Sequence, residues 1–251
     1  MFLLGIKIDN LTKKEVLEKI KTFLNIPGQY KIFTPNPEML VDAQTDLYFK
    51  EVLNSGDLNI CDGKGIEIFA GEKIERISGI DLMTDILKLA EQNNYSVFFL
   101  GSGDKQTLEH LKNNLIKIYP NLKIAGLNKG LEINKILIEN KEKLSFNKQE
   151  NDELIGEIVM TKPQIIFVAF GHKKQEKWIN EFLRDLPSVK IAMGVGGSFD
   201  YLADKTKRAP VWMRKIGLEW FFRLLSEPKK RVLRIFKAVF IFPYLIFKNK
   251  K

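Results

Sequence analysis

Two short polar motifs near the start of the chain carry the residue types of a catalytic site. Thr34 and Asn36 end an apolar segment, and prolines after each of them fix the backbone so that a hydroxyl and an amide are presented. Asp62 ends a second apolar segment and precedes a glycine-rich turn. A carboxylate held partly desolvated beside a ligand acts as a general base when its pKa rises toward neutrality.

Ordinary structural roles fit the same two motifs. Asn and Pro are common turn and helix-start residues, so Asn36 need not touch a ligand. Asp62 also has the spacing of an N-cap before a helix. Local spacing leaves both alternatives open.

Glycines farther along the chain point to an anionic ligand. Gly194, Gly196 and Gly197 fall within four positions after an apolar segment, which lets a diphosphate approach the backbone and leaves N–H groups to bind it. The Gly-Ser-Gly motif at 101–103 is a weaker phosphate candidate, because it lacks the third glycine of a dinucleotide fingerprint.

A third polar motif lies between the glycine segments. Gln175 and Glu176 open a segment of helical period, and their amide and carboxylate groups suit sugar hydroxyls. His172 suits a base or a capping group. No second His or acid follows at a metal-ligand spacing, and there is no Asp-x-Asp motif, so the sequence predicts neither a metal site nor a cofactor.

Apolar segments with strand character alternate with helical ones along most of the chain. The predicted strands cover 30–34, 57–61, 96–100, 122–125, 164–170 and 189–193. The predicted helices cover 12–24, 80–92, 105–118 and 174–186, and Thr12 with Glu15 can form a capping box at the first of them. This alternation predicts an α/β, Rossmann-like parallel sheet with helices on both faces.

Two regions depart from the alternation. The Lys-, Asn- and Glu-rich segment 128–149 is expected to be an irregular insertion or a surface helix. From Arg208 onward only helix-like segments follow, so we predict a catalytic domain at 1–205 and a helical appendage at 206–251.

The appendage is strongly basic. Residues 205–251 hold 14 of the 40 Lys and Arg but only two of the 31 acids, interleaved with aromatic residues. Its longest uncharged apolar run has ten residues and contains Pro243, about half of what a membrane-spanning helix needs. It suits a membrane interface, a nucleic acid, or packing on the protein's own core. The single cysteine, Cys61, excludes an internal disulfide and favours a reducing compartment.

Six motifs in order give the chain a family resemblance. They are TPNPEML, DGKGI, ERISGID, GHKKQEKWI, GVGGSFD and KRAPVWMRKIGLEWFFRLLSEP, spread from Thr34 to about Arg234. Together they resemble the WecG/TagA/CpsF family of bacterial glycosyltransferases. The resemblance implies metal-independent, inverting transfer of an N-acetylmannosamine-type sugar from a UDP-sugar to an undecaprenyl-diphosphate-linked saccharide, in teichoic acid or polysaccharide synthesis.

The resemblance also implies residue roles. Asp62 corresponds to the catalytic base, Thr34 and Asn36 to polar residues of the catalytic pocket, and Arg76 and Gln175 to pocket residues. We expect Gly194, Gly196 and Gly197 on the nucleotide side, from their chemistry.

Appendage arginines complete the expected site. Arg223 matches the first of the family's arginines, and Arg208 and Arg214 are further basic candidates. The family places an Arg two residues after the proline, where this chain has Lys230, so either Lys230 or Arg231 is expected to serve. The chain also reads Gly171-His172-Lys173-Lys174 before Gln175 and Glu176, where the family more commonly has Gly-x-Pro-x.

The resemblance places the protein in the cytoplasm, peripheral on the inner face of the cell membrane. It implies an anionic membrane surface and a homo-oligomer as partners, and no nucleic acid. The donor sugar, the acceptor glycan and the pathway stay open. A basic nucleic-acid-binding α/β module is the alternative, since aromatic and basic side chains also stack on bases. A dinucleotide-dependent dehydrogenase is less favoured, because the glycine fingerprint is incomplete.

Overall fold

A computed structural model describes residues 1–138 and 141–249, except for the side chain of Lys230. Its centre is a six-stranded sheet in the order β4-β3-β10-β9-β5-β6, and every neighbouring pair is parallel. The strands are β3 (Tyr30–Phe33), β4 (Leu58–Asn59), β5 (Ser96–Gly101), β6 (Lys123–Asn128), β9 (Ile165–Ala169) and β10 (Ile191–Gly194). All six lie at the predicted places, so the parallel α/β fold is confirmed.

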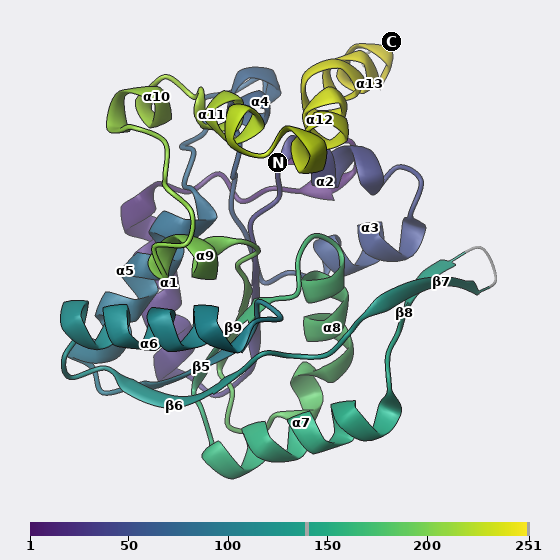
Figure 1. Cartoon of the computed structure of the whole chain (residues 1–251). Coiled ribbons are helices and arrows are strands. Elements are labelled where there is room, and N and C mark those ends of the chain that lie inside the picture. The colour runs from purple at the N-terminus through teal and green to yellow at the C-terminus, as the bar shows by residue number, and fades with distance from the viewer. Residues whose placement is uncertain (139–140, 250–251) are drawn as a thin grey trace.

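Helices cover both faces of this sheet (Figure 1). On one face lie α1 (Lys13–Asn25), α5 (Gly79–Gln92) and α6 (Lys105–Ile118). On the other lie α2 (Pro37–Asp42), α3 (Leu47–Asn54), α7 (Lys148–Thr161) and α8 (Lys174–Phe182). Short elements complete the body: α4 (Lys64–Phe69), α9 (Ser198–Leu202), η1 (Leu183–Asp185) and the hairpin of β1 (Phe2–Leu3) and β2 (Ile6–Lys7).

Strand alternation explains why there are two cores. In β5, Val97 and Phe99 belong to the core under α1, α5 and α6, whereas Phe98 and Leu100 belong to the core under α3, α7 and α8. Successive side chains of a strand point to opposite faces, so a strand buried on both sides is apolar throughout. The predicted capping box also forms, because Thr12 Oγ1 accepts from Glu15 N–H and Glu15 Oε2 accepts from Thr12 N–H.

The expectation for segment 128–149 was wrong over most of its described part. After the end of β6, the chain forms an antiparallel hairpin of β7 (Asn134–Ile138) and β8 (Lys141–Ser145), and residues 139–140 between them lie outside the described residues. Charges hold the hairpin to the body. Lys177 on α8 is fully buried, and its ammonium group hydrogen-bonds the Glu142 carbonyl and lies 2.8 Å from Asp46 Oδ2. These partners are distant in sequence, so local periodicity could not show them.

The helical appendage is confirmed as helical and lies across one end of the body (Figure 1). It consists of α10 (Val211–Lys215), α11 (Glu219–Ser226), α12 (Pro228–Phe236), the π-helical turn η2 (Lys237–Ile241) and α13 (Phe242–Asn249). Phe242 and Ile246 are buried in the same core as α3 and α8, and Phe242 meets Phe69 edge to face. The last helix is therefore anchored in the body. Within residues 1–138 and 141–249, no helix is both long and apolar enough to cross a bilayer.

Candidate active site

A cavity of about 640 Å³ lies between the carboxyl edge of the sheet and the appendage, a volume typical of small-molecule sites. Ten of the predicted site residues line it. They are Thr34, Asn36, Asp62, Arg76, Gln175, Gly194, Gly196, Gly197, Arg223 and Arg231.

The sheet order explains this convergence. Strands β4, β3, β10 and β9 are neighbours, and the loops that follow them carry Asp62, Thr34, the Gly196 turn and His172. Because all four strands run in the same direction, their carboxyl ends meet at one edge. The appendage supplies the opposite wall through α11, α12 and η2.

Asp62 is a partly buried acceptor, and it does not cap the helix that follows it. The helix α4 begins after Gly63, which makes no side-chain capping bond. The Asp62 carboxylate instead accepts a hydrogen bond from the Gly79 N–H at the start of α5, at 3.1 Å. Burial raises the pKa of Asp62, while Gly79, Arg223 and Arg76 partly oppose the rise. The result is a carboxylate poised to take a proton.

Thr34 and Asn36 lie beside this carboxylate with different local roles. Asn36 caps α2, since its Oδ1 accepts from Met39 N–H at 3.1 Å. The structural alternative for Asn36 is therefore correct, although the residue also lines the cavity. Thr34 lies close to Gly79, the residue that also binds Asp62.

Gly79→Ala tests how closely these groups are packed. A Cβ atom at residue 79 would lie 3.2 Å from Thr34 Oγ1 and 3.4 Å from Asp62 Oδ2, both in the cavity wall. Alanine is tolerated in the first turn of a helix, so we expect a folded protein whose turnover falls by roughly tenfold through displaced reacting groups. Gly156→Ala, which meets nothing within 4 Å, is the control. Unchanged turnover in Gly79→Ala would mean that the wall adapts.

The glycine segment is braced by Gln175. Gln175 Oε1 accepts the Gly196 N–H at 2.9 Å, and a Cβ at Gly194 would lie 2.8 Å from Gln175 Nε2. The Gly196 N–H is thus not free for a phosphate, contrary to the expectation for this loop. The weaker motif at 101–103 is also unavailable, because the Ser102 and Gly103 N–H groups donate to the Ala169 and Lys129 carbonyls.

Among the described residues, four arginines line the cavity: Arg76, Arg223, Arg231 and Arg234. Arg76 donates to the Arg214 carbonyl at 2.6 Å and so ties the body to α10. Arg223 pairs with Glu219 at 2.7 Å and lies over the Tyr201 ring, while its Nε atom is buried with no partner among the described residues. Arg231 pairs with Glu227 at 2.9 Å and lines the cavity. The side chain of Lys230, the alternative to Arg231, lies outside the described residues.

Arg208 lies outside the cavity wall. Its guanidinium binds both carboxylate oxygens of Asp81, at 2.6 and 2.9 Å, and donates to Ser78 Oγ at 3.0 Å. This fork joins the start of the appendage to the first turn of α5. Arg208 therefore holds the appendage in place in this structure.

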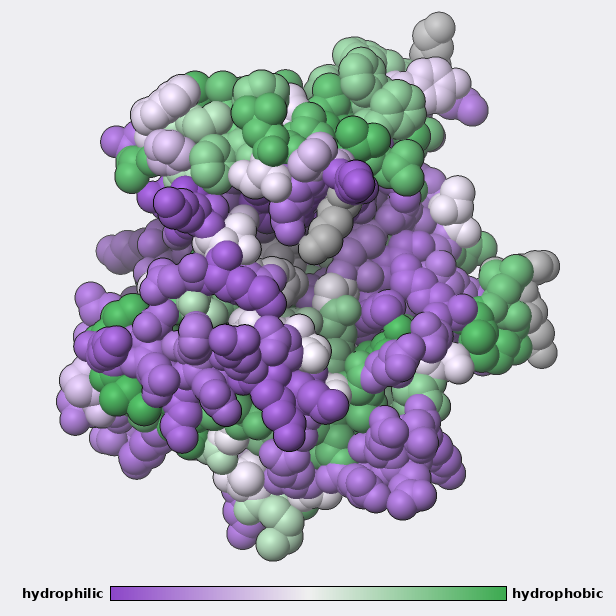
Figure 2. All heavy atoms as spheres, in the orientation of Figure 1, coloured by the Kyte–Doolittle hydropathy of each residue, from purple (hydrophilic) through white to green (hydrophobic). Residues whose placement is uncertain are grey.

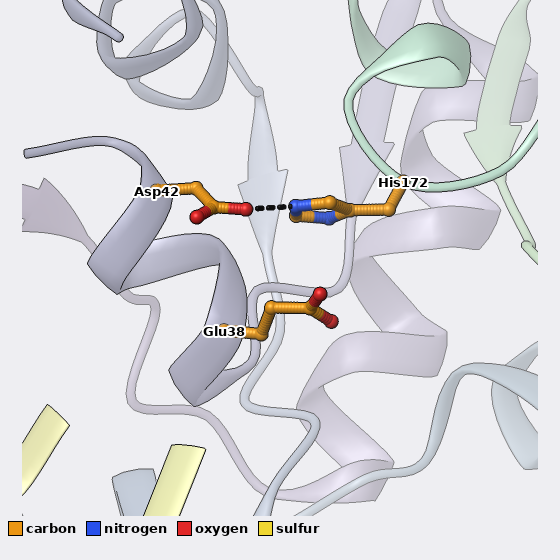
Figure 3. A group of neighbouring side chains, drawn as sticks. All are labelled: Glu38, Asp42 and His172. Carbon is orange, nitrogen blue, oxygen red and sulfur yellow. Dashed lines mark hydrogen bonds and ion pairs between the residues drawn. The ribbon is translucent and has the colours of Figure 1, made fainter. Parts of the chain in front are cut away.

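Sequence reasoning missed a charged cluster of Glu38, Asp42 and His172 (Figure 3), of which Glu38 and His172 line the cavity. Glu38, Asp42 and His172 bring their polar atoms within 4.8 Å of one another, and Asp42 Oδ2 lies 2.7 Å from His172 Nε2. Although burial opposes it, the hydrogen bonds and charges of His172 and Lys237 hold the pKa of Asp42 well below its ordinary value.

Basic residues of the appendage already neutralise this cluster. Arg234 lies 2.7 Å from Glu38, and Lys237 lies 2.6 Å from Asp42. A metal ion would compete with both cations, so we assign the cluster to holding α12 and η2 on α2. The helical spacing of the two acids and of the two bases was a visible signal, but their pairing across about 195 residues was not.

Cys61 contributes no reactive thiol. It is buried, and burial with the nearby Asp62 raises the pKa of its thiol to about 12. A thiol with that pKa stays protonated at neutral pH and is a poor nucleophile. Cys61 is therefore not a candidate nucleophile of this site.

Together the fold and the cavity are those of an α/β protein with a small-molecule site at the carboxyl edge of its sheet. The comparison with protein families makes the class specific. The whole chain, residues 1–251, matches the model of the Glycosyl transferase WecG/TagA/CpsF family, and the chain belongs to this family.

Curated relatives agree over nearly the full length. The chain is 33% identical over 256 residues to the N-acetylglucosaminyldiphosphoundecaprenol N-acetyl-beta-D-mannosaminyltransferase of Staphylococcus aureus strain MW2, which covers 99% of this chain and 92% of the relative. Identity and coverage are the same for the enzyme of that name from strain NCTC 8325.

Proposed function

We propose that this glycosyltransferase moves an N-acetylmannosamine-type sugar from a UDP-sugar to an undecaprenyl-diphosphate-linked saccharide, with inversion and without a metal. The names of the Staphylococcus aureus relatives support the sugar and the lipid-linked acceptor. The observation that carries the proposal is the partly buried Asp62, with its raised pKa, in a cavity walled in part by Arg76, Arg223 and Arg231. Family membership removes the support for a nucleic-acid-binding module.

The geometry suits a single displacement. Asp62 takes the proton of the acceptor hydroxyl while the hydroxyl oxygen attacks the anomeric carbon of the donor sugar. The bond between that carbon and the UDP oxygen breaks. The leaving diphosphate keeps the electron pair, and its charge is stabilised by Arg223, Arg76 and Arg231. Arginines supply here the positive charge that divalent cations supply in other phosphate sites.

The outer face of the appendage supports a site on an anionic membrane. Trp212, Leu233 and Phe240 are 61%, 75% and 63% exposed, and Figure 2 shows apolar side chains gathered over the C-terminal helices. Lysines and arginines of the same helices suit lipid phosphates. We propose peripheral attachment at the inner face of the cell membrane, which brings a lipid-linked acceptor to the cavity. Self-association through this face stays a prediction.

Release of UDP from a panel of UDP-sugars tests the proposed reaction. The acceptor is a short-chain lipid diphosphate carrying N-acetylglucosamine, and a parallel series contains a metal chelator. We expect turnover with UDP-N-acetylmannosamine that the chelator does not reduce. Loss of turnover with chelator would refute metal independence, and silence across the panel with no binding of UDP would refute the donor class.

Acidic substitutions on the outer face of the appendage test the proposed attachment to the membrane. We expect the double variant Leu233→Asp, Phe240→Asp to bind anionic vesicles at least tenfold more weakly, because it removes immersed apolar area and repels anionic lipid. Co-sedimentation with phosphatidylglycerol vesicles measures this. Leu137→Asp is the matched control, since Leu137 is 72% exposed on the hairpin. Equal binding by the double variant and the control would exclude this face.

A further inference from the structure

Glu176 is a buried carboxyl group in the cavity wall with one unused oxygen. It is only 2% exposed and lines the cavity. Its Oε1 atom accepts a hydrogen bond from Gln175 Nε2 at 2.8 Å. Its Oε2 atom is buried and has no hydrogen-bond partner among the described residues. A buried polar atom without a partner in a binding cavity points to a ligand.

The neighbouring hydrogen bonds fix which oxygen can carry a proton. Gln175 Oε1 accepts the Gly196 N–H, so Gln175 must turn its Nε2 donor toward Glu176. Oε1 of Glu176 is thereby an acceptor. A proton on this carboxyl group sits on Oε2, which then becomes a donor.

The surroundings favour the protonated form. No ion pair to Glu176 is found within the described part of the chain, and the nearby cations are engaged elsewhere. His172 Nε2 faces Asp42, while Lys173 and Lys177 face Asp46 and Glu142. A buried carboxylate without a cation is unfavourable, and burial raises the pKa of Glu176 although His172 and Gln175 partly oppose the rise.

We propose that Glu176 is a substrate-binding residue whose neutral carboxyl group donates a hydrogen bond from Oε2 to an oxygen of the nucleotide-sugar. A neutral acid in the cavity wall does not repel an anionic ligand in the cavity, whereas a carboxylate there would oppose binding of that ligand. The inference rests on the proposed function for the identity of the donor. The accepting oxygen belongs either to the sugar or to the diphosphate.

Two isosteric variants test the proposal by calorimetric titration with UDP-N-acetylmannosamine and with UDP alone. Glu176→Gln keeps an acceptor toward Gln175 and places an N–H donor at the position of Oε2, so we expect its Kd within about threefold of wild type. Glu176→Met keeps the length but has no donor, and we expect at least tenfold weaker binding. Thermal melting confirms that both variants fold.

The two ligands separate the possible sources of the oxygen. Weakening of the Met variant for UDP-N-acetylmannosamine alone assigns the bond to the sugar, and weakening for both ligands assigns it to the diphosphate. The proposal would be overturned if Glu176→Gln bound the ligands as weakly as Glu176→Met. It would also be overturned if Glu176→Met bound them as tightly as the wild-type protein. Failure of the wild-type protein to bind either ligand would instead count against the proposed function.

Discussion

Asp62→Asn should lower sugar transfer by about a thousandfold, because it removes the group proposed to take the proton from the acceptor hydroxyl. General base catalysis contributes roughly 10² to 10⁴ in rate, and an amide cannot replace it. The amide still fills the site beside Gly79 N–H, so binding of the UDP-sugar should change little. Release of UDP in the presence of acceptor measures the rate, and calorimetry measures the binding.

The direction of the Asp62 pKa shift adds two expectations. Burial raises the folded-state pKa, so kcat/KM should fall on the acid side with a pKa above the ordinary aspartate value. The stability that Asp62 contributes is fully present below its unfolded pKa and is lost as pH rises through the folded pKa, since the native state binds the proton more tightly. Asp62→Asn should therefore melt at the same or a higher temperature at neutral pH.

Asp152→Asn is the matched control for this experiment, because Asp152 is exposed on α7 and does not line the cavity. It should keep wild-type turnover and melting. Wild-type turnover in Asp62→Asn, or an unchanged acid limb in its residual activity, would remove Asp62 as the base.

Arg223→Ala should lower turnover by roughly 10² to 10³, the range observed when one preorganised donor to a developing charge is lost. Its Nε atom is buried and unpartnered among the described residues, and its charge acts on Asp62 across the cavity. Removing it weakens stabilisation of the leaving diphosphate and also raises the pKa of Asp62 further. Single-turnover kinetics with UDP-N-acetylmannosamine would measure the loss.

Substitution by lysine separates charge from geometry at the same position. Arg223→Lys keeps a positive charge but loses the planar fork over Tyr201, so its activity should lie between that of wild type and Arg223→Ala. Arg184→Lys, in η1 at the far end of α8, should behave as wild type. Equal activity in Arg223→Ala and wild type would show that the arginine wall does not act on the leaving group.

Patterns of short range made most of the fold predictable. The strands β5 and β9 are continuous apolar runs, which is the signature of a parallel sheet buried on both faces, and the capping box of α1 is read from Thr12 and Glu15 alone. The β7–β8 hairpin was not predicted because β7 is exposed at every position and so lacks an alternating apolar face. Its anchor, Lys177, lies far away in sequence on α8. Distant ion pairs leave no local periodicity.

The residues of the candidate site also fall into a group that the sequence could predict and a group that it could not. Thr34, Asp62 and Gly196 each end a recognisable strand, so a parallel sheet was enough to bring them together. Arg208 has the same residue type as Arg223, yet it meets Asp81 and not the cavity. Whether an appendage arginine reaches the cavity depends on the path of the chain after β10, which the sequence does not show. The anchoring of Phe242 in the body also could not be read from an apolar tail that suits membranes equally well.

The central pairing of β3 with β10 also sets the order in which the molecule can form. Tyr30 pairs with Ile191, 161 positions farther along the chain. At synthesis rates of about 5–20 residues per second, β10 follows β3 out of the ribosome after roughly 8–30 s. During that interval Thr34 and Asp62 have no opposing glycine turn, and the apolar side chains of β3 have only β4 beside them. Closure of a loop this long makes nucleation through β3 and β10 slow. The catalytic edge is thus among the last parts of the nascent chain to become structured.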